Sequence, residues 1–278
     1  MALVRMDKLL EKAEKEHCGI GAFNVGNMEM IIGTVKAAEE LNRPIIMQIA
    51  EVRLTHSPLD LIGPMMIHAA RNASVDIAVH LDHGRSEKTI RQALELGFTS
   101  VMYDGSTFPY RTNVENTKHI VELAGEYDAC AEGELGIVGG SEGGGEGMKI
   151  KYTDPLDAKM FCQKTQVNAL AVAIGNAHGN YKETPQLKFD VLNQIREKTP
   201  VPLVLHGGSG ISDEDFREAI RYGIRKINIA TASLNSLAAS ARDCVLEKKN
   251  PSFFDLNEAM VEGTYQNVKH HIEVFSCV

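Results

Sequence analysis

The chain has 278 residues, of which 44% are hydrophobic, 24% charged and 6% aromatic, which is typical of a globular protein and excludes a disordered or collagen-like one. Its 29 basic and 37 acidic side chains give a net charge of −8, so we expect neither nucleic acid nor an anionic membrane as a partner. No apolar run approaches the roughly 20 residues that cross a bilayer. The charged amino-terminal segment lacks the apolar stretch of a signal peptide, so we expect a cytoplasmic protein.

Five cysteines are scattered along the chain and none is spaced as CxxC. This pattern fits neither a disulfide framework nor a thiolate zinc site, so we predict reduced thiols.

Short apolar or β-branched runs recur along the whole chain. Several, such as Leu203–Leu205, are apolar throughout, which is typical of strands buried on both faces of a parallel sheet. The predicted strands cover Gly19–Val25, Pro44–Ala50, Asp76–Leu81, Thr99–Tyr103, Asp128–Leu135, Asn168–Gly175, Val201–His206 and Ile224–Ile229.

Segments with helical periodicity alternate with these strands. Ser57–Pro58 opens one of them with a capping residue and a proline in the first turn. Pro64 is expected to delay the start of that helix or to kink it. The other predicted helices cover Glu29–Asn42, Ser86–Leu96, Asn113–Tyr127, Asp154–Thr165, Leu187–Lys198 and Ser212–Tyr222, and a long helical tail follows Thr231.

Eight strands that alternate with helices over about 250 residues are typical of a (β/α)8 barrel. A doubly wound open sheet usually carries a glycine-rich turn after its first strand, and residues 24–29 contain no GxGxxG. No linker divides the chain. We therefore predict a single α/β domain over residues 1–278, a TIM barrel whose carboxyl-terminal helical extension packs on the rim and is a candidate for self-association as a homodimer or homotetramer.

The segment Gly139–Gly147 interrupts this rhythm with six glycines in nine residues. It follows the fifth predicted strand, at the end of a barrel where active sites lie. The segment is either a surface loop or a lid that closes over the site.

Three histidines follow three different predicted strands, and each precedes a glycine: His83, His178 and His206. Because the carboxyl ends of all barrel strands meet at one mouth, we expect the three rings to converge. Facial imidazole ligands with an open position suit a catalytic zinc ion. His80 lies below them, where it either braces the site or fills the barrel.

Two glycine-rich or polar turns follow the last two strands, Gly207–Gly210 and Asn228–Thr231. Barrels commonly bind phosphate there through backbone N–H groups and a helix amino terminus. The turns therefore predict a phosphate site.

Seven motifs, AFNV, HLDHG, MYDGS, EGELG, GNAHG, LHGGSG and INIAT, occur in this order and resemble the zinc-dependent class II fructose- and tagatose-bisphosphate aldolase family. The resemblance implies that His83, His178 and His206 hold zinc, with Asp104 and Glu134 at an alternative or second metal position. It implies that Asp82 exchanges a proton with the aldehyde oxygen. The phosphate of dihydroxyacetone phosphate would lie, beside a monovalent cation, against Gly179, Gly207, Gly208, Ser209, Asn228, Ile229, Ala230 and Thr231.

The reaction implied by this resemblance is reversible aldol cleavage of a ketose phosphate. Dihydroxyacetone phosphate is the donor, an aldehyde is the acceptor, and the metal acts as a Lewis acid. A glutamate of the glycine-rich loop would handle the proton on the donor carbon, which makes Glu142 the candidate and Glu146 the reserve.

The sequence departs from the family pattern at several places. The loop reads Ser141-Glu142-Gly143 where relatives commonly carry adjacent acids, and Ala50 stands where they often have serine. Ala232–Leu234 replaces an acidic residue and an arginine, and Asp255–Asn257 replaces Asp-Pro-Arg. Because arginines of this kind grip a distal phosphate, we predict an unphosphorylated or differently charged aldehyde.

Other interpretations are a true fructose- or tagatose-bisphosphate aldolase, or a non-catalytic partner that stabilises one. A Schiff-base aldolase needs a buried reactive lysine, for which Lys226 is the candidate, but it leaves the histidines unexplained. A metal-dependent hydrolase usually has HxH on the first strand, and the first predicted strand has none.

Overall fold

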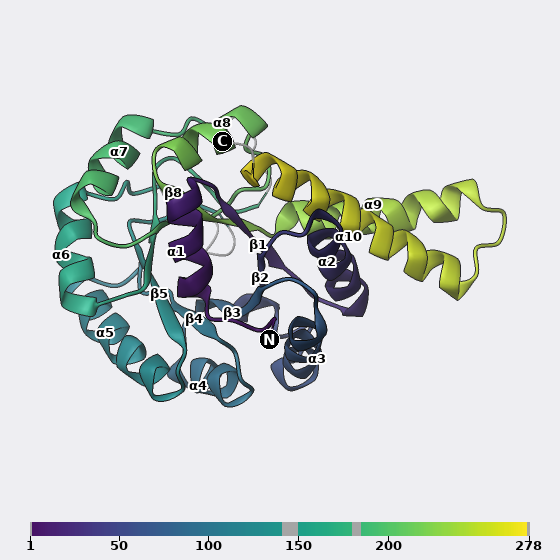
Figure 1. Ribbon diagram of the computed structural model, residues 1–278, viewed down its shortest axis with the longest axis horizontal. Coiled ribbons are helices and arrows are strands. Elements are labelled where there is room, and N and C mark those ends of the chain that lie inside the picture. The colour runs from purple at the N-terminus through teal and green to yellow at the C-terminus, as the bar shows by residue number, and fades with distance from the viewer. Residues whose placement is uncertain (1, 141–149, 180–184, 277–278) are drawn as a thin grey trace.

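The computed structural model describes residues 2–140, 150–179 and 185–276, and in them eight parallel strands close into a barrel in chain order. Helices surround the barrel (Figure 1). The strands are β1 Ile20–Asn24, β2 Ile45–Ala50, β3 Ile77–Gly84, β4 Ser100–Tyr103, β5 Cys130–Leu135, β6 Ala169–Val172, β7 Leu203–Leu205 and β8 Ile224–Ile229. The helices are α1 Met6–Glu16, α2 Met28–Leu41, α3 Leu59–Asn72, α4 Glu87–Glu95, α5 Tyr110–Glu126, α6 Pro155–Thr165, α7 Phe189–Lys198, α8 Asp213–Arg221, α9 Thr231–Glu247 and α10 Phe253–Ser276, with the 3-10 turn η1 Glu51–Arg53 after β2.

The predicted (β/α)8 fold is confirmed, and each predicted strand overlaps an observed one. The expected delay at Pro64 is wrong, because α3 begins at Leu59, directly after Pro58, and continues through Pro64. Leu59, Ile62 and Met66 bury one face of α3 on the barrel, and this packing outweighs the backbone hydrogen bond that the proline removes.

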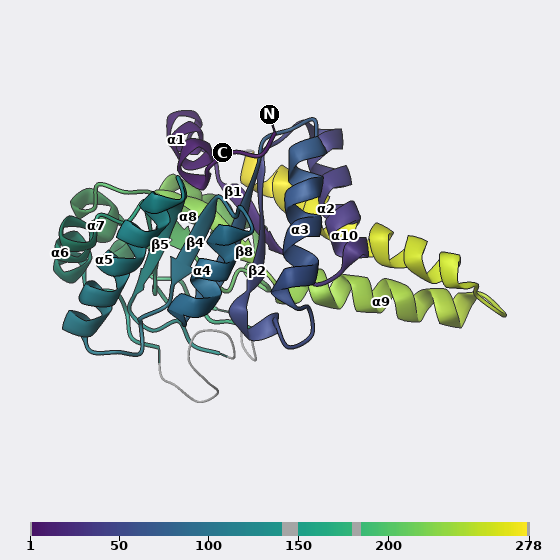
Figure 2. The ribbon, with the colours of Figure 1, turned by 90° about the horizontal axis from the view of Figure 1, so that it is seen from below.

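Helix α1 was not among the predicted elements, and it closes the amino-terminal end of the barrel (Figures 1 and 2). Its buried residues Met6, Leu9, Leu10 and Ala13 pack on the inward-facing apolar side chains of the strands, which form the floor of the barrel. The apolar face of this amphipathic helix is therefore part of the hydrophobic core.

The inside of the barrel changes from apolar to polar toward the carboxyl ends of the strands. Side chains of a strand alternate with a period of two, so Ala78, His80 and Asp82 of β3 all face inward. Neighbouring strands repeat the order: Ile46 and Gln48 on β2 pair with Ala78 and His80. A polar layer therefore lies on the apolar floor and just below the mouth.

The carboxyl-terminal extension is a helical hairpin of α9 and α10 that projects well beyond the barrel (Figures 1 and 2). Helix α10 packs against α2, where a side chain larger than glycine at Gly33 would meet the Val261 carbonyl oxygen at 2.6 Å. The start of α9 also lies on the barrel, through Leu234 and Leu237, and the far ends of both helices extend away from it (Figure 2).

His271 anchors α10 and should make stability fall in acid. Its ring packs between Phe216 and Phe275, and burial lowers its pKa to about 4, against about 6.5 in an unfolded chain. The unfolded state therefore binds more protons between these values. Stability present above pH 6.5 is lost as the pH falls toward 4, by up to about 3 kcal/mol.

Urea unfolding of His271→Phe at several pH values tests this expectation. The wild-type protein should lose about 1.4 kcal/mol more per pH unit than the variant in that window. The exposed His68 serves as the control in His68→Gln, whose slope should match that of the wild type. Equal slopes for the wild type and His271→Phe would contradict it.

No helix in the described part of the chain is long and apolar enough to cross a bilayer.

Candidate active site

Three histidine rings converge at the carboxyl-terminal mouth of the barrel. His83 comes from the end of β3, His178 follows β6, and His206 directly follows β7. All three are buried, their ring centroids are 4.7–5.7 Å apart, and each offers a nitrogen within 4.8 Å of the others. The structure thus brings together the three residues predicted to bind metal.

An irregularity at the end of β3 turns two consecutive side chains into the mouth. In a regular strand Asp82 and His83 would face opposite sides. Here the pairing of β3 with β4 shifts register between Leu81 and Gly84, and His83 takes a left-handed φ of 46°. The bulge re-aims His83, whose Nε2 lies 4.0 Å from Asp82 Oδ1.

Asp104 orients His83 from the end of β4. Its Oδ2 lies 3.0 Å from His83 Nδ1, so the ring donates through Nδ1 and turns Nε2 toward the other histidines. Burial lowers the pKa of His83, but the charges of Asp82 and Asp104 outweigh burial and raise it to about 10. The hydrogen bonds from His83 and Ser106 hold the pKa of Asp104 below its usual range despite burial.

Glu134 of β5 supplies the observation that tests for a metal. It groups with His83 and Asp104 as a second possible ligand set. Both of its carboxylate oxygens are buried and have no hydrogen-bond partner among the described residues. Burial and the charge of Asp104 raise its pKa well above the usual value. A buried carboxylate without a hydrogen-bond partner is costly, and a divalent cation would offset that cost, so these residues fit a metal ion.

Asp82 is held by three side-chain amides. Asn24 on β1 and Gln48 on β2 donate to Oδ2 at 3.0 and 3.1 Å, and Asn228 on β8 donates to Oδ1 at 3.0 Å. The carbonyl oxygens of these amides are buried without a hydrogen-bond partner in the described part of the chain. The amide nitrogens therefore fix the Asp82 carboxylate, and the amide oxygens remain available as acceptors for a polar ligand.

The turns after β7 and β8 meet at the start of α9. Gly207 has φ 66°, and a Cβ there would meet the Ala177 carbonyl oxygen at 2.2 Å. Ser209 Oγ accepts from Ala232 N at 2.9 Å, so these turns join at the amino terminus of a 17-residue helix that begins at Thr231. Gly179 and Gly208 lie in the loops that follow β6 and β7, and the arrangement suits an anion.

Some of the predicted phosphate ligands do not direct a side chain toward the start of α9. Asn228 is turned into the barrel toward Asp82, and Ile229 is fully buried, so Ile229 and Ala230 offer only their backbone. Glu142 and Glu146, predicted to lie on the catalytic loop, fall outside the described residues. The roles predicted for all these residues stay predictions.

Four inward-facing polar residues of the site had no assigned role in the sequence-based site: Asn24, Gln48, Glu132 and Lys226. Each is a polar residue in an otherwise apolar strand, which the sequence does show. The strand register, which the sequence does not show, is needed to tell which face of the sheet each residue occupies. Lys226, weighed above as a Schiff-base lysine, is fully buried and ion-paired with Glu132 at 2.8 Å.

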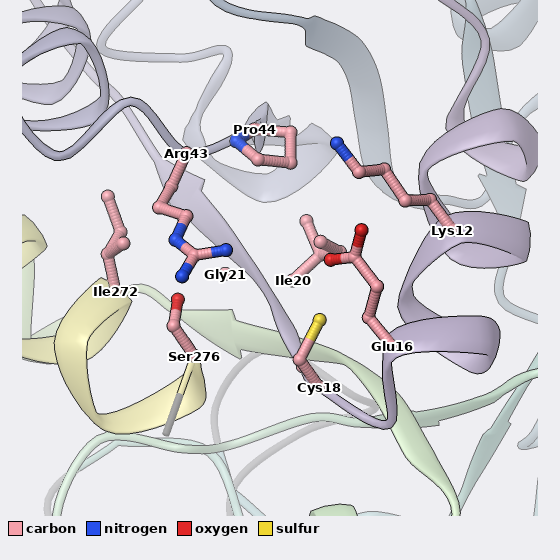
Figure 3. Close-up of a pocket in the computed structure, with 10 residues that line it drawn as sticks. Lys12, Glu16, Cys18, Ile20, Gly21, Arg43, Pro44, Ile272 and Ser276 are labelled. Atoms are coloured by element: carbon pink, nitrogen blue, oxygen red, sulfur yellow. The ribbon is translucent and has the colours of Figure 1, made fainter. Parts of the chain in front are cut away.

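Two of the cavities lie at opposite ends of strand β1. One of about 290 Å³ adjoins the site, because Asn24, which holds Asp82, is one of its walls. The other lies by the amino end of β1, between Lys12, Cys18 and Arg43 (Figure 3), and its volume of about 10 Å³ holds at most one water molecule. The first is therefore the candidate substrate cavity.

A (β/α)8 barrel with buried histidines and carboxylates at its carboxyl-terminal mouth has the arrangement of a barrel enzyme, whose active site lies at that end of the strands. The family described as fructose-bisphosphate aldolase class-II matches residues 4–278. A sulfofructosephosphate aldolase of Alkalicoccus urumqiensis is 35% identical over 99% of this chain and 97% of its own. A fructose-bisphosphate aldolase of Geobacillus stearothermophilus is 36% identical over 95% and 92%.

Solved structures agree with these relatives. The crystal structure of the YdjI aldolase from Escherichia coli K12 superposes with a TM-score of 0.86 at 34% identity, over 98% of this chain and 97% of that one. The chain belongs to the class II fructose-bisphosphate aldolase family, as the motifs indicated. Family membership supports an aldolase, and the family is generally metal-dependent.

Proposed function

We propose that the protein is a zinc-dependent aldolase that reversibly cleaves a ketose phosphate into dihydroxyacetone phosphate and an aldehyde. The observation that carries this proposal is the convergence of His83, His178 and His206 on one another, with the buried carboxylate of Asp82 4.0 Å from His83. A zinc ion held by the three histidines would supply Lewis-acid stabilisation of the negative charge that develops on the donor. A monovalent cation beside the phosphate and a cytoplasmic location are parts of the same proposal.

The chain's own residues divide the remaining work. Asp82 takes the proton of the C4 hydroxyl as the C3–C4 bond breaks, and returns it in synthesis. Asn24, Gln48 and Asn228 keep that carboxylate aimed at the reacting oxygen. The electron pair of the broken bond stays on C3, which then receives a proton from the loop glutamate, Glu142 in this proposal.

The cavity beside Asp82 supports an acceptor other than a typical phosphorylated triose. Its wall on α9 is apolar, formed by Leu234 and Leu237, and Met30 of α2 adds to it, whereas Arg53 and His56 line the cavity elsewhere. Leu234 falls in the stretch where relatives carry an arginine. Cleavage of fructose 1,6-bisphosphate should therefore be slow, and a rate equal to that with the best unphosphorylated or differently charged acceptor would contradict this part of the proposal.

Proton exchange tests the donor half of the reaction without knowledge of the aldehyde. Dihydroxyacetone phosphate is incubated with the enzyme in D2O, and NMR follows its hydroxymethyl carbon with zinc and after chelation. Zinc-dependent exchange is expected. Its absence in a folded, zinc-loaded protein would overturn the proposed donor and favour a non-catalytic partner of an aldolase.

We also propose that the protein is a homodimer or homotetramer assembled through the tip of the helical hairpin. Val245, Leu246, Phe253 and Phe254 are 53–75% exposed there, and single apolar residues rarely gather in this way on a monomer. Phe253→Glu with Phe254→Glu should lower the mass measured by light scattering to that of one chain or of a smaller assembly. Leu61→Glu, at an equally exposed site on α3, should leave the mass unchanged, and an unchanged mass in the tip variant would contradict the prediction.

A further inference from the structure

A buried chain of charged contacts lies directly below the histidine cluster. Lys226 Nζ on β8 is 2.8 Å from Glu132 Oε2 on β5. The other oxygen of that carboxylate, Oε1, is 2.8 Å from His206 Nε2. Lys226, Glu132 and His206 are all fully buried, so the contacts act in a medium of low dielectric constant where they are strong.

These contacts determine which ring nitrogen of His206 carries the proton. Glu132 faces Lys226 Nζ through Oε2 and His206 Nε2 through Oε1. A carboxylate that is ion-paired in this way accepts hydrogen bonds, so the geometry assigns the proton to His206 Nε2, which donates to Glu132. Nδ1 then keeps its lone pair and points toward His83 Nε2, 2.9 Å away. The 3.3 Å contact of Nε2 with the Asn228 amide nitrogen joins two donors in this state and is not a hydrogen bond.

Lys226 holds the carboxylate in the position that this arrangement requires. Among the described residues, the ammonium nitrogen of Lys226 is the group nearest to Glu132 Oε2, at 2.8 Å. The next donor near Oε2 is His80 Nε2, at 3.7 Å, and without the ammonium group the carboxylate is free to rotate toward it. A lysine that makes this contact at 0% exposure is also poorly placed to meet a carbonyl substrate.

We propose that Lys226 is the positioning residue of the metal centre: through Glu132 it fixes His206 as the Nε2–H tautomer and so presents Nδ1 as the metal ligand. The inference rests on the metal site of the proposed function. Partners that orient a ligand histidine typically change metal affinity by about 10–100-fold. Lys226→Met should therefore weaken zinc binding by that factor although the residue touches no ligand directly.

The first test reads the tautomer in the metal-free full-length protein. Long-range 1H–15N NMR of histidine-labelled protein, with His206 assigned by its loss in His206→Asn, should show the Nε2–H form in the wild type. Lys226→Met should shift His206 toward the Nδ1–H form or a mixture. Arg225→Met is the matched control, because Arg225 is a buried cation on the same strand whose partner is Glu14, at 2.9 Å, on the outside of the barrel.

The second test measures zinc affinity by competition with a chromophoric chelator. Lys226→Met and Glu132→Gln should each lower it about 10–100-fold, and the double variant should be no worse than either. Arg225→Met should bind zinc as the wild type does even where it lowers thermal stability. Should Lys226→Met fail to fold, Glu132→Gln decides through the same two readouts.

Two outcomes overturn the proposal: wild-type zinc affinity with an unchanged His206 tautomer in the folded variants, or additive losses in the double variant. Failure of the proposed function is seen separately, since it appears as absent zinc binding or proton exchange in the wild-type protein. The tautomer is read without either activity.

Discussion

Asp82→Asn should separate the two halves of the aldol reaction. Turnover of the ketose should fall about 10²–10⁴-fold, the usual contribution of a positioned acid–base group. Exchange of the donor proton of dihydroxyacetone phosphate should persist, because that step needs the metal ligands and the loop base but no proton at the aldehyde oxygen. Asparagine keeps the size of the side chain within the ring of amides around position 82.

Steady-state turnover and NMR exchange on the same preparation measure both halves. Asp76→Asn is the matched control, since Asp76 is exposed at the amino end of β3 and should leave both rates unchanged. Equal loss of turnover and exchange in Asp82→Asn would show that Asp82 serves the donor step or the metal site instead.

His206→Ala should abolish both turnover and exchange by removing the metal. In the wild type, zinc at a thousandfold excess over its dissociation constant should stabilise the fold by about 4 kcal/mol. The variant keeps two imidazoles, so zinc should raise its melting temperature far less, and metal analysis should find well under one ion per chain. Elsewhere, His119→Ala removes an exposed histidine on α5 and should retain the full zinc response.

Scanning calorimetry with and without chelator provides the measurement. A variant that still binds one zinc ion and exchanges donor protons would exclude His206 as a ligand and leave the set of His83, Asp104 and Glu134 as the metal site.

The barrel was predictable because its strands are apolar throughout, its helices have a clear period, and glycines or caps mark most boundaries. The three histidines were predictable for a related reason, since parallel strands bring their carboxyl ends to one mouth. Helix α1 was missed because its charged residues were weighed only against a signal peptide. Its apolar face packs on the floor of the barrel. The local sequence pattern of the helix does not reveal this contact.

The inner polar layer was harder to predict from sequence. Gln48, Glu132 and Lys226 are single polar residues in buried strands, and their contacts depend on strand register across the barrel. Asn228 shows the same limit, because the contact of its side chain with Asp82 depends on strand alternation and register, which its motif does not reveal. The bulge that aligns Asp82 with His83 likewise follows from a register shift between β3 and β4.

The apolar floor beneath α1 has a kinetic consequence. With Met6, Leu9 and Leu10 filling the amino-terminal end, the ketose and both cleavage products must use the mouth at the other end. Under the proposed function, a product bound deeper in this mouth would leave after the one bound above it. Cleavage should therefore release its products in a fixed order, and the last to leave should inhibit competitively against the ketose, while the first should not.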